Sequence, residues 1–147
     1  MRHLPRFLIA CGVVLLAIGC TGGRQPMPAL APVVLGEDTR QTDAFQLNAA
    51  AVDGDVLAIE VSYAGGCRNH EFLLRASRSF QVVSGSVRLE IALIHNANED
   101  PCEAFLTEQF RFDLDPVKRL YRQTYSQETG TVYLRLDGHA GPLVYRF

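Results

Sequence analysis

The stretch VRLEIAL, residues 87–93, decides the fold, because its apolar and polar side chains alternate along the chain. Its four large aliphatic residues fall on one face, and Arg88 and Glu90 fall on the other. A period of two is typical of a β-strand that buries one face. The same alternation recurs and predicts about seven strands, over residues 43–51, 55–64, 69–76, 86–95, 105–114, 130–137 and 142–147.

Short strands with turn signals between them predict an all-β fold. Asp53-Gly54 is a hairpin signal, and Gly138 to Pro142 is a second turn. We expect an antiparallel two-sheet sandwich of immunoglobulin-like type. A small open barrel is the alternative architecture, because periodicity does not determine strand order. One short helix is expected over 116–125, with Asp115 as its cap and with inward-facing residues Val117, Leu120 and Tyr121.

The composition of the 147-residue chain argues for one compact domain. The chain is 48% apolar and 20% charged, with a formal charge of −2. These values disfavour both wholesale disorder and a strongly basic surface that would bind nucleic acid.

Residues 1–19 have the organisation of a signal peptide. Arg2 and Arg6 form a basic start, and an uninterrupted apolar run over 7–18 follows. A helix of that run spans about 18 Å, against a hydrocarbon core of about 30 Å. A transmembrane helix is therefore the weaker interpretation.

The end of this segment, Ala17-Ile18-Gly19-Cys20, resembles the lipobox of bacterial lipoproteins, although Ala17 stands where Leu is usual. The resemblance implies cleavage before Cys20, thioether diacylation of its sulfur and acylation of the new amino group. Thr21, in place of an acidic residue, implies sorting to the outer membrane. The first predicted partner is therefore a membrane, reached through the lipid anchor. An ordinary secretory signal is the alternative.

Residues 20–42 are expected to form the lipidated N-terminus and a flexible tether, because glycines and three prolines leave no sustained period. A tether of this length reaches about 60–70 Å when extended. Residues 43–147 form the predicted sandwich domain. Loss of residues 1–19 removes two Arg and no acidic residue, which leaves 12 basic and 16 acidic residues and a formal charge of −4. Such a charge attracts neither nucleic acid nor anionic lipid.

Two cysteines remain in the exported domain, Cys67 and Cys102. An even pair outside the cytoplasm most simply forms a disulfide. Their separation of 35 residues corresponds to about 4 kcal/mol of stabilisation in the loop-entropy model.

The loops of an antiparallel sandwich alternate between its two ends, so both cysteine loops and the turn at 138–141 are expected at one end. The three histidines of the mature chain would fall there too: His70, His95 and His139. Two metal sites are alternatives. One is a Cys₂His₂ site of Cys67, His70, His95 and Cys102, and the other combines the three histidines with Asp100 or Glu99.

The favoured interpretation assigns no metal and no cofactor to the histidines. His70 is in phase with Phe72 and Leu74, and His95 is in phase with Leu93. Both are therefore predicted to be strand-end side chains that hydrogen-bond to loop backbone.

Two further patterns bear on chemistry. Asn96-x-Asn98-x-Asp100 resembles the opening of a calcium loop, but Pro101 stands where that loop needs Gly and Thr107 where it needs Glu. An Asx-rich turn is the better prediction. The sequence holds no nucleophile elbow, glycine-rich phosphate loop or His-Glu-x-x-His motif, so no enzymatic activity is predicted.

Residues 57–115 resemble uncharacterised bacterial lipoproteins that share two cysteine motifs, here Gly65-Gly66-Cys67 and Pro101-Cys102-Glu103-Ala104. No activity comes with the resemblance. The sequence therefore predicts a lipid-anchored cell-envelope protein, at the outer membrane and facing the periplasm or the cell surface. Its expected role is that of a binding or structural module with an envelope protein as partner. The alternative is a metal-handling envelope lipoprotein that uses His70, His95 and His139.

Overall fold

The computed structural model describes residues 29–36 and 42–147, and its elements include every strand that the sequence predicts. The signal peptide, Cys20 and most of the tether lie outside the described residues. In chain order the elements are β1 (Leu30–Pro32), β2 (Val34–Leu35), β3 (Gln46–Asp53), β4 (Val56–Gly65), β5 (Glu71–Ala76), β6 (Gln81–Val83), β7 (Ser86–Asn96), β8 (Ala104–Asp113), α1 (Asp115–Tyr125), β9 (Thr131–Leu136) and β10 (Leu143–Arg146).

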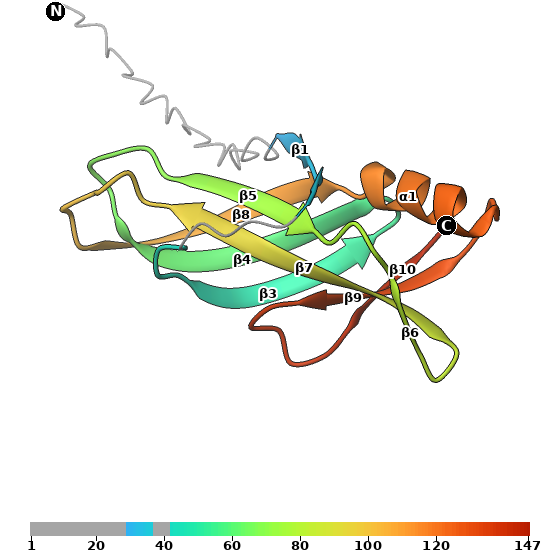
Figure 1. The fold of residues 1–147 in the computed structure, drawn as a ribbon. Coiled ribbons are helices and arrows are strands. Elements are labelled where there is room, and N and C mark those ends of the chain that lie inside the picture. Colours follow the sequence, from blue (N-terminus) through green and yellow to red (C-terminus); the bar gives the residue numbers. More distant parts are fainter. Residues whose placement is uncertain (1–28, 37–41) are drawn as a thin grey trace, which may run out of the picture.

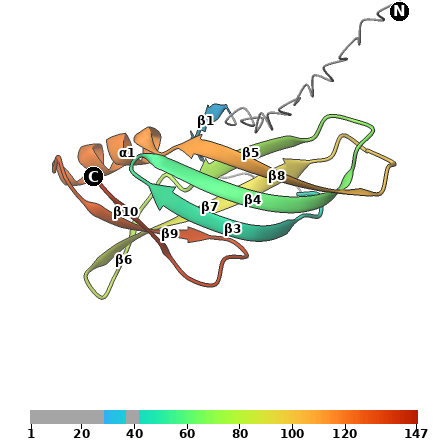
Figure 2. The ribbon, with the colours of Figure 1, turned by 180° about the vertical axis from the view of Figure 1, so that it is seen from behind.

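Two sheets pack face to face, which confirms the predicted all-β sandwich (Figure 1). One sheet has the strand order β1-β8-β4-β3. The other has the order β10-β9-β7-β5-β2, and β6 pairs with the start of β7. The helix α1 lies at one end of the sandwich, and the loops that follow β4 and β7 extend from the opposite end (Figure 2).

Alternate residues of the facing strands fill the space between the sheets, as the period of two requires. Burying a side chain of this size contributes about 1.5–3 kcal/mol relative to leaving it in water. The largest fully buried apolar residues are Tyr145, Phe112, Leu57, Ile59, Leu74, Leu89, Leu114 and Leu134.

The expectation of purely antiparallel sheets is wrong at three strand pairs. β7 pairs with β9, β1 with β8 and β2 with β5, each in parallel. β7 and β9 run the same way because the chain reverses twice between them, once before β8 and once through α1. Both sheets are therefore mixed, since neighbours in a sheet are often not neighbours in the chain.

The tether prediction is wrong for its last described part, residues 30–35. These residues add β1 to one sheet and β2 to the other. Between them, Val33 is 3% exposed and belongs to the core, and its N–H donates to the Asp113 carbonyl oxygen at 3.2 Å. Pro32 fits here because an edge strand tolerates a residue without an N–H. The proline content that suggested a linker is thus compatible with edge strands.

The predicted helix is present, but its cap differs from the expectation. Asp115 is the first helical residue rather than the cap, and Leu114 occupies the N-cap position. The Asp113 carboxylate accepts the Asp115 N–H at 2.9 Å. Val117 and Tyr121 are buried, as predicted. Across the described residues, no helix combines the length and apolar character needed to cross a membrane.

At the α1 end of the sandwich, the carboxylate of Asp55 connects neighbouring elements. Asp55 follows the Asp53-Gly54 turn. This carboxylate accepts the Tyr145 hydroxyl at 2.7 Å and the Lys118 ammonium. Hydrogen bonds from Lys118 and then Tyr145 hold the pKa of Asp55 below its usual range. One side chain therefore links the β3–β4 turn to α1 and to β10.

Val33→Ala tests whether the segment before β3 belongs to the folded domain. Removing two buried methyl groups is expected to lower the free energy of unfolding by about 2 kcal/mol in chemical denaturation. Leu30→Ala is the matched control, since Leu30 is 50% exposed and should cost little. Equal, negligible effects of both substitutions would mean that this segment is a free tether.

Candidate functional site

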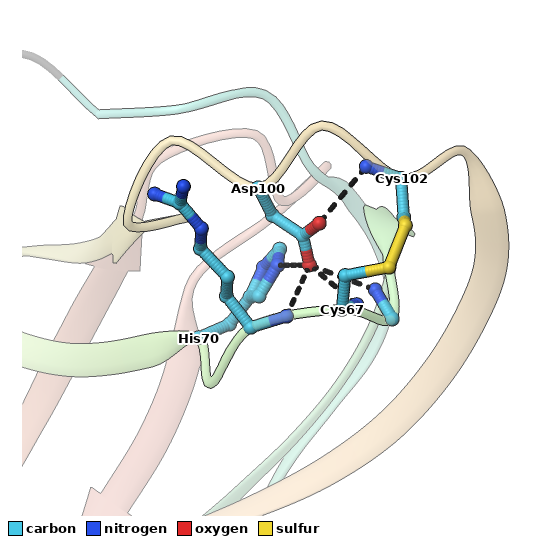
Figure 3. Close-up of a disulfide and its surroundings, with 6 residues drawn as sticks. Cys67, His70, Asp100 and Cys102 are labelled. Carbon is cyan, nitrogen blue, oxygen red and sulfur yellow. Dashed lines mark hydrogen bonds and ion pairs between the residues drawn. A yellow bond between two sulfur atoms is a disulfide. The ribbon is translucent and has the colours of Figure 1, made fainter.

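Cys67 and Cys102 form the predicted disulfide. Cys67 lies in the loop after β4, Cys102 lies in the loop before β8, and their Cα atoms are 5.8 Å apart. Each of these loops crosses from one sheet to the other. The disulfide therefore closes the end of the sandwich opposite α1 (Figure 3).

The carboxylate of Asp100 lies beside the disulfide and accepts hydrogen bonds from both loops. Its Oδ2 accepts the backbone N–H groups of Gly66, Cys67 and Arg68, each at 2.9 Å. Its Oδ1 accepts the N–H of Cys102, also at 2.9 Å. Successive N–H groups that converge in this way form an anion-binding nest, here filled by a side chain of the same protein (Figure 3).

The hydrogen bonds determine the charge state of Asp100. Its side chain is fully buried, and burial raises the pKa of a carboxyl group. The N–H groups of the cysteine loops and the His70 side chain outweigh this effect and hold the pKa of Asp100 well below its usual range. Asp100 is therefore an anion at neutral pH, and its negative charge is part of the folded structure.

The two glycines before Cys67 are explained by this packing. A Cβ atom on Gly65 would lie 2.5 Å from His70 Nε2, closer than any real contact. Gly66 has a φ of +117°, which side-chain-bearing residues rarely adopt. The Gly-Gly-Cys motif thus lets the backbone approach both His70 and Asp100.

Two histidines continue the hydrogen-bond chain from Asp100 into the protein. His70 Nε2 is 3.1 Å from Asp100 Oδ2, and His70 Nδ1 is 2.8 Å from His95 Nε2. The exposed fractions are 2% for the His70 side chain and 1% for His95. The three residues form a buried relay in which one carboxylate and two imidazoles are joined end to end.

Aromatic rings enclose the two imidazoles. Phe72 stacks on His95 with ring centroids 4.3 Å apart, and Tyr63 stacks on His70 at 4.6 Å. Burial, followed by the nearby Glu108 carboxylate, raises the pKa of Tyr63 to about 12. The Tyr63 side chain is therefore neutral, and its ring packs against both histidines.

The expectation of hydrogen bonds to loop backbone is wrong for His70, whose two ring nitrogens bond to His95 and Asp100. The His95 ring bonds to His70 and also interacts with the backbone of Asp43 and Ala44 before β3. The expected meeting of three histidines is also wrong. His139 Nδ1 hydrogen-bonds the Gly141 carbonyl oxygen within its own turn, at 2.7 Å. The reason is strand length: β9 pairs with β7 as far as Ile91 and stops five residues before Asn96, about 16 Å short of the disulfide end.

The Asx-rich turn is confirmed. Asn98 N–H donates to Asn96 Oδ1 at 3.1 Å, and Cys102 N–H donates to Asp100 Oδ1. The Asp100 oxygens that a calcium loop would turn toward an ion are occupied by protein N–H groups. This turn therefore positions the Asp100 carboxylate over the Gly65–Arg68 loop.

The described residues bring one group of metal-ligand atoms together: Cys67, Asp100 and Cys102, whose atoms lie within 4.8 Å of one another. The two sulfur atoms are bonded to each other, and thiolates rather than disulfides are metal ligands. The Asp100 oxygens already accept five donors. At the disulfide end of the sandwich, these groups bond to each other and hold the two cysteine loops together.

An open groove of about 750 Å³ crosses the six-stranded sheet. Its lining includes Arg75 of β5, Glu90 and Ile94 of β7, Arg135 of β9, and His139. A volume of this size is typical of ligand sites, and charges of both signs line this one. The sequence analysis missed the groove, because residues from three strands and two turns meet there only after pairing.

No protein-family model matches the chain, and no curated protein is similar to it in sequence. The chain is similar in fold to a NigD-like immunity protein from Bacteroides caccae, with a TM-score of 0.57 and 12% sequence identity over 78% of this chain. The chain spans 58% of that protein's length.

Two further solved structures have lower scores. A protein of unknown function, DUF1344, from Bacteroides vulgatus has a TM-score of 0.49 and 13% identity over 82% of this chain and 56% of its own. A candidate lipoprotein from Bacteroides fragilis has a TM-score of 0.47 and 12% identity over 80% of this chain and 69% of its own.

Asp100→Asn tests the role of the carboxylate. The substitution places an NH₂ group against N–H donors, so the Tm is expected to fall by about 5 °C or more in thermal unfolding followed by circular dichroism. Glu99→Gln is the matched control, because the neighbouring Glu99 is exposed and should leave the Tm unchanged. A Tm of Asp100→Asn equal to that of the wild type would show that the nest does not contribute to stability.

Proposed function

We propose that this chain is a lipid-anchored cell-envelope protein that acts as a binding or structural module, with an envelope protein as its partner. The observation that carries the proposal is the contrast between the two polar regions of the domain. The relay of Asp100, His70 and His95 is buried and bonded within the protein. The groove over β5, β7 and β9 is open and has charged walls.

A non-enzymatic role fits the geometry of the relay. A catalytic acid or base must come within hydrogen-bond reach of a substrate. His70 and Asp100 are instead bonded to each other, and the loop with Gly66 and Cys67 covers them. The relay therefore serves the structure of the disulfide end.

The anchor is supported by the lipobox-like stretch that ends at Cys20 and by the position where the fold begins. Nine residue steps separate Cys20 from Ala29, next to β1, and they reach about 30 Å when fully extended. This is about half the reach expected when the whole of 20–42 is counted as tether. A lipid on Cys20 would hold the sandwich close to the membrane, and its acyl chains would supply the membrane affinity.

The groove supports recognition of a polar protein surface. Arg135 can pair with a carboxylate of a partner, and Glu90 and Asp137 can pair with its basic groups. Charges of both signs favour a partner of mixed charge, in keeping with the mild acidity of the mature chain. The proposed partner is therefore an envelope protein rather than nucleic acid.

Cys20→Ala tests the proposed anchoring. The wild-type protein is expected in the membrane fraction and labelled by a metabolic fatty-acid probe, whereas Cys20→Ala should lose the label and leave that fraction. Cys11→Ala is the control, since that cysteine lies within the signal peptide and should leave labelling intact. Unlabelled, soluble wild-type protein would contradict the proposal.

A photo-crosslinking residue in place of Arg135 extends the same experiment to the partner. In intact envelopes it is expected to give one discrete protein adduct. The same probe in place of Gln109, on the outer face of the other sheet, should not give that adduct. The same adduct pattern from both positions would contradict recognition through the groove.

A further inference from the structure

The contact between the two buried histidines limits how many protons they can hold. His70 Nδ1 and His95 Nε2 are 2.8 Å apart, and a hydrogen bond of this length needs one N–H and one lone pair. On its other side, His70 Nε2 must carry a proton, because it faces the ionised Asp100 carboxylate. With the contact intact, the pair therefore holds at most three protons, although two free imidazolium rings carry four.

The third proton of the pair can bind to His95 Nδ1. This nitrogen is buried and has no hydrogen-bond partner among the described residues. Burial lowers the pKa of His95, while backbone groups of Asp43 and Ala44 near the ring oppose the shift. The inner end of the relay is thus the point where a further proton enters, next to the backbone of Asp43 and Ala44.

The groups around the pair come from every neighbouring element. Asp43, before β3, favours a charged His95, and His70, before β5, disfavours it. Asp100, in the loop after β7, pairs with His70. Tyr63 of β4 stacks on His70, lies tilted against His95 and contacts Glu108 of β8. Phe72 of β5 and Phe45 complete the enclosure without charge.

We propose that the His70–His95 contact is an acid-sensitive latch for the disulfide end of the protein. At neutral pH one shared proton joins the rings and holds the Gly65–Arg68 loop against the aromatic cluster. In acid, a further proton at the contact places two N–H groups against each other, and the rings separate. His70 then leaves the cluster, the loop loses its inner support, and the faces of Tyr63 and Phe72 become accessible while the disulfide remains intact.

The sign of the pH dependence follows from proton binding. In the open form the His95 ring is solvated and takes up a proton near the ordinary imidazole pKa of about 6.5. In the closed form burial lowers the pKa of His95. The open form therefore binds more protons, and opening becomes progressively easier as the pH falls below about 6.5.

The test uses the full-length, disulfide-intact protein in detergent. Imidazole ¹⁵N resonances are followed from pH 8 to pH 4.5, together with exchange of the Gly66, Cys67 and Arg68 amides after correction for intrinsic chemistry. The account predicts one shared proton between the two rings at pH 7.5. It also predicts that amide protection falls about tenfold or more between pH 7.5 and pH 5.

His95→Gln separates the latch from general acid instability. Glutamine keeps a neutral hydrogen-bonding group next to His70 but takes up no proton, so the loss of protection between pH 7 and pH 5 should disappear. His139→Gln is the control, since it removes a histidine outside the pair and should leave that loss unchanged. Undiminished protection of the wild type at pH 4.5 would overturn the proposal, as would equal acid sensitivity of wild type and His95→Gln.

Discussion

The carboxylate of Asp100 is the interaction on which the disulfide end depends. Its two oxygens accept N–H groups from both cysteines, from Gly66 and Arg68, and from His70. A buried carboxylate without such donors would be expelled or protonated, because burial penalises its charge. With them, a single anion aligns the two loops that connect the sheets. The same two loops carry Cys67 and Cys102, whose sulfur atoms form the disulfide.

Much of the fold was readable from side-chain periodicity, because half-buried strands need apolar residues at alternate positions. Leu57, Ile59 and Val61 are buried, as the pattern predicted. The parallel pairs were not readable, since alternation is the same in parallel and antiparallel strands. The edge strands β1 and β2 were missed because they are three and two residues long. A pattern of period two needs at least four residues to be recognised.

The sequence was enough to predict which residues lie at the disulfide end. It was not enough to predict which of them contact one another. The signal-peptide pattern predicted export, and predicted export made a Cys67–Cys102 disulfide the simplest expectation. The phase of His70 and His95 placed both on the buried face of their strands. Register and strand length were needed to place His139, and neither is encoded in local pattern. The role of Asp100 was hidden for a similar reason, because three of its donors, the N–H groups of Gly66, Cys67 and Arg68, lie more than thirty residues away in the chain.

Each end of the sandwich is held together by the hydrogen bonds of one carboxylate. Asp55 ties α1 and β10 to the first hairpin, and Asp100 ties the cysteine loops together. Between these ends, the open groove over β5, β7 and β9 is lined by charged side chains of both signs. The proposed binding surface and the hydrogen-bonded ends are thus different parts of the molecule.

The most direct measurement of the central claim is amide hydrogen exchange at Gly66, Cys67, Arg68 and Cys102 before and after reduction of the disulfide at neutral pH. If the Asp100 carboxylate holds the loops, these four amides keep most of their protection when the sulfur–sulfur bond is broken. The hydrogen bonds that protect them do not involve sulfur. Complete loss of protection on reduction, with the rest of the sandwich still folded, would show that the disulfide and not the carboxylate organises this end of the protein.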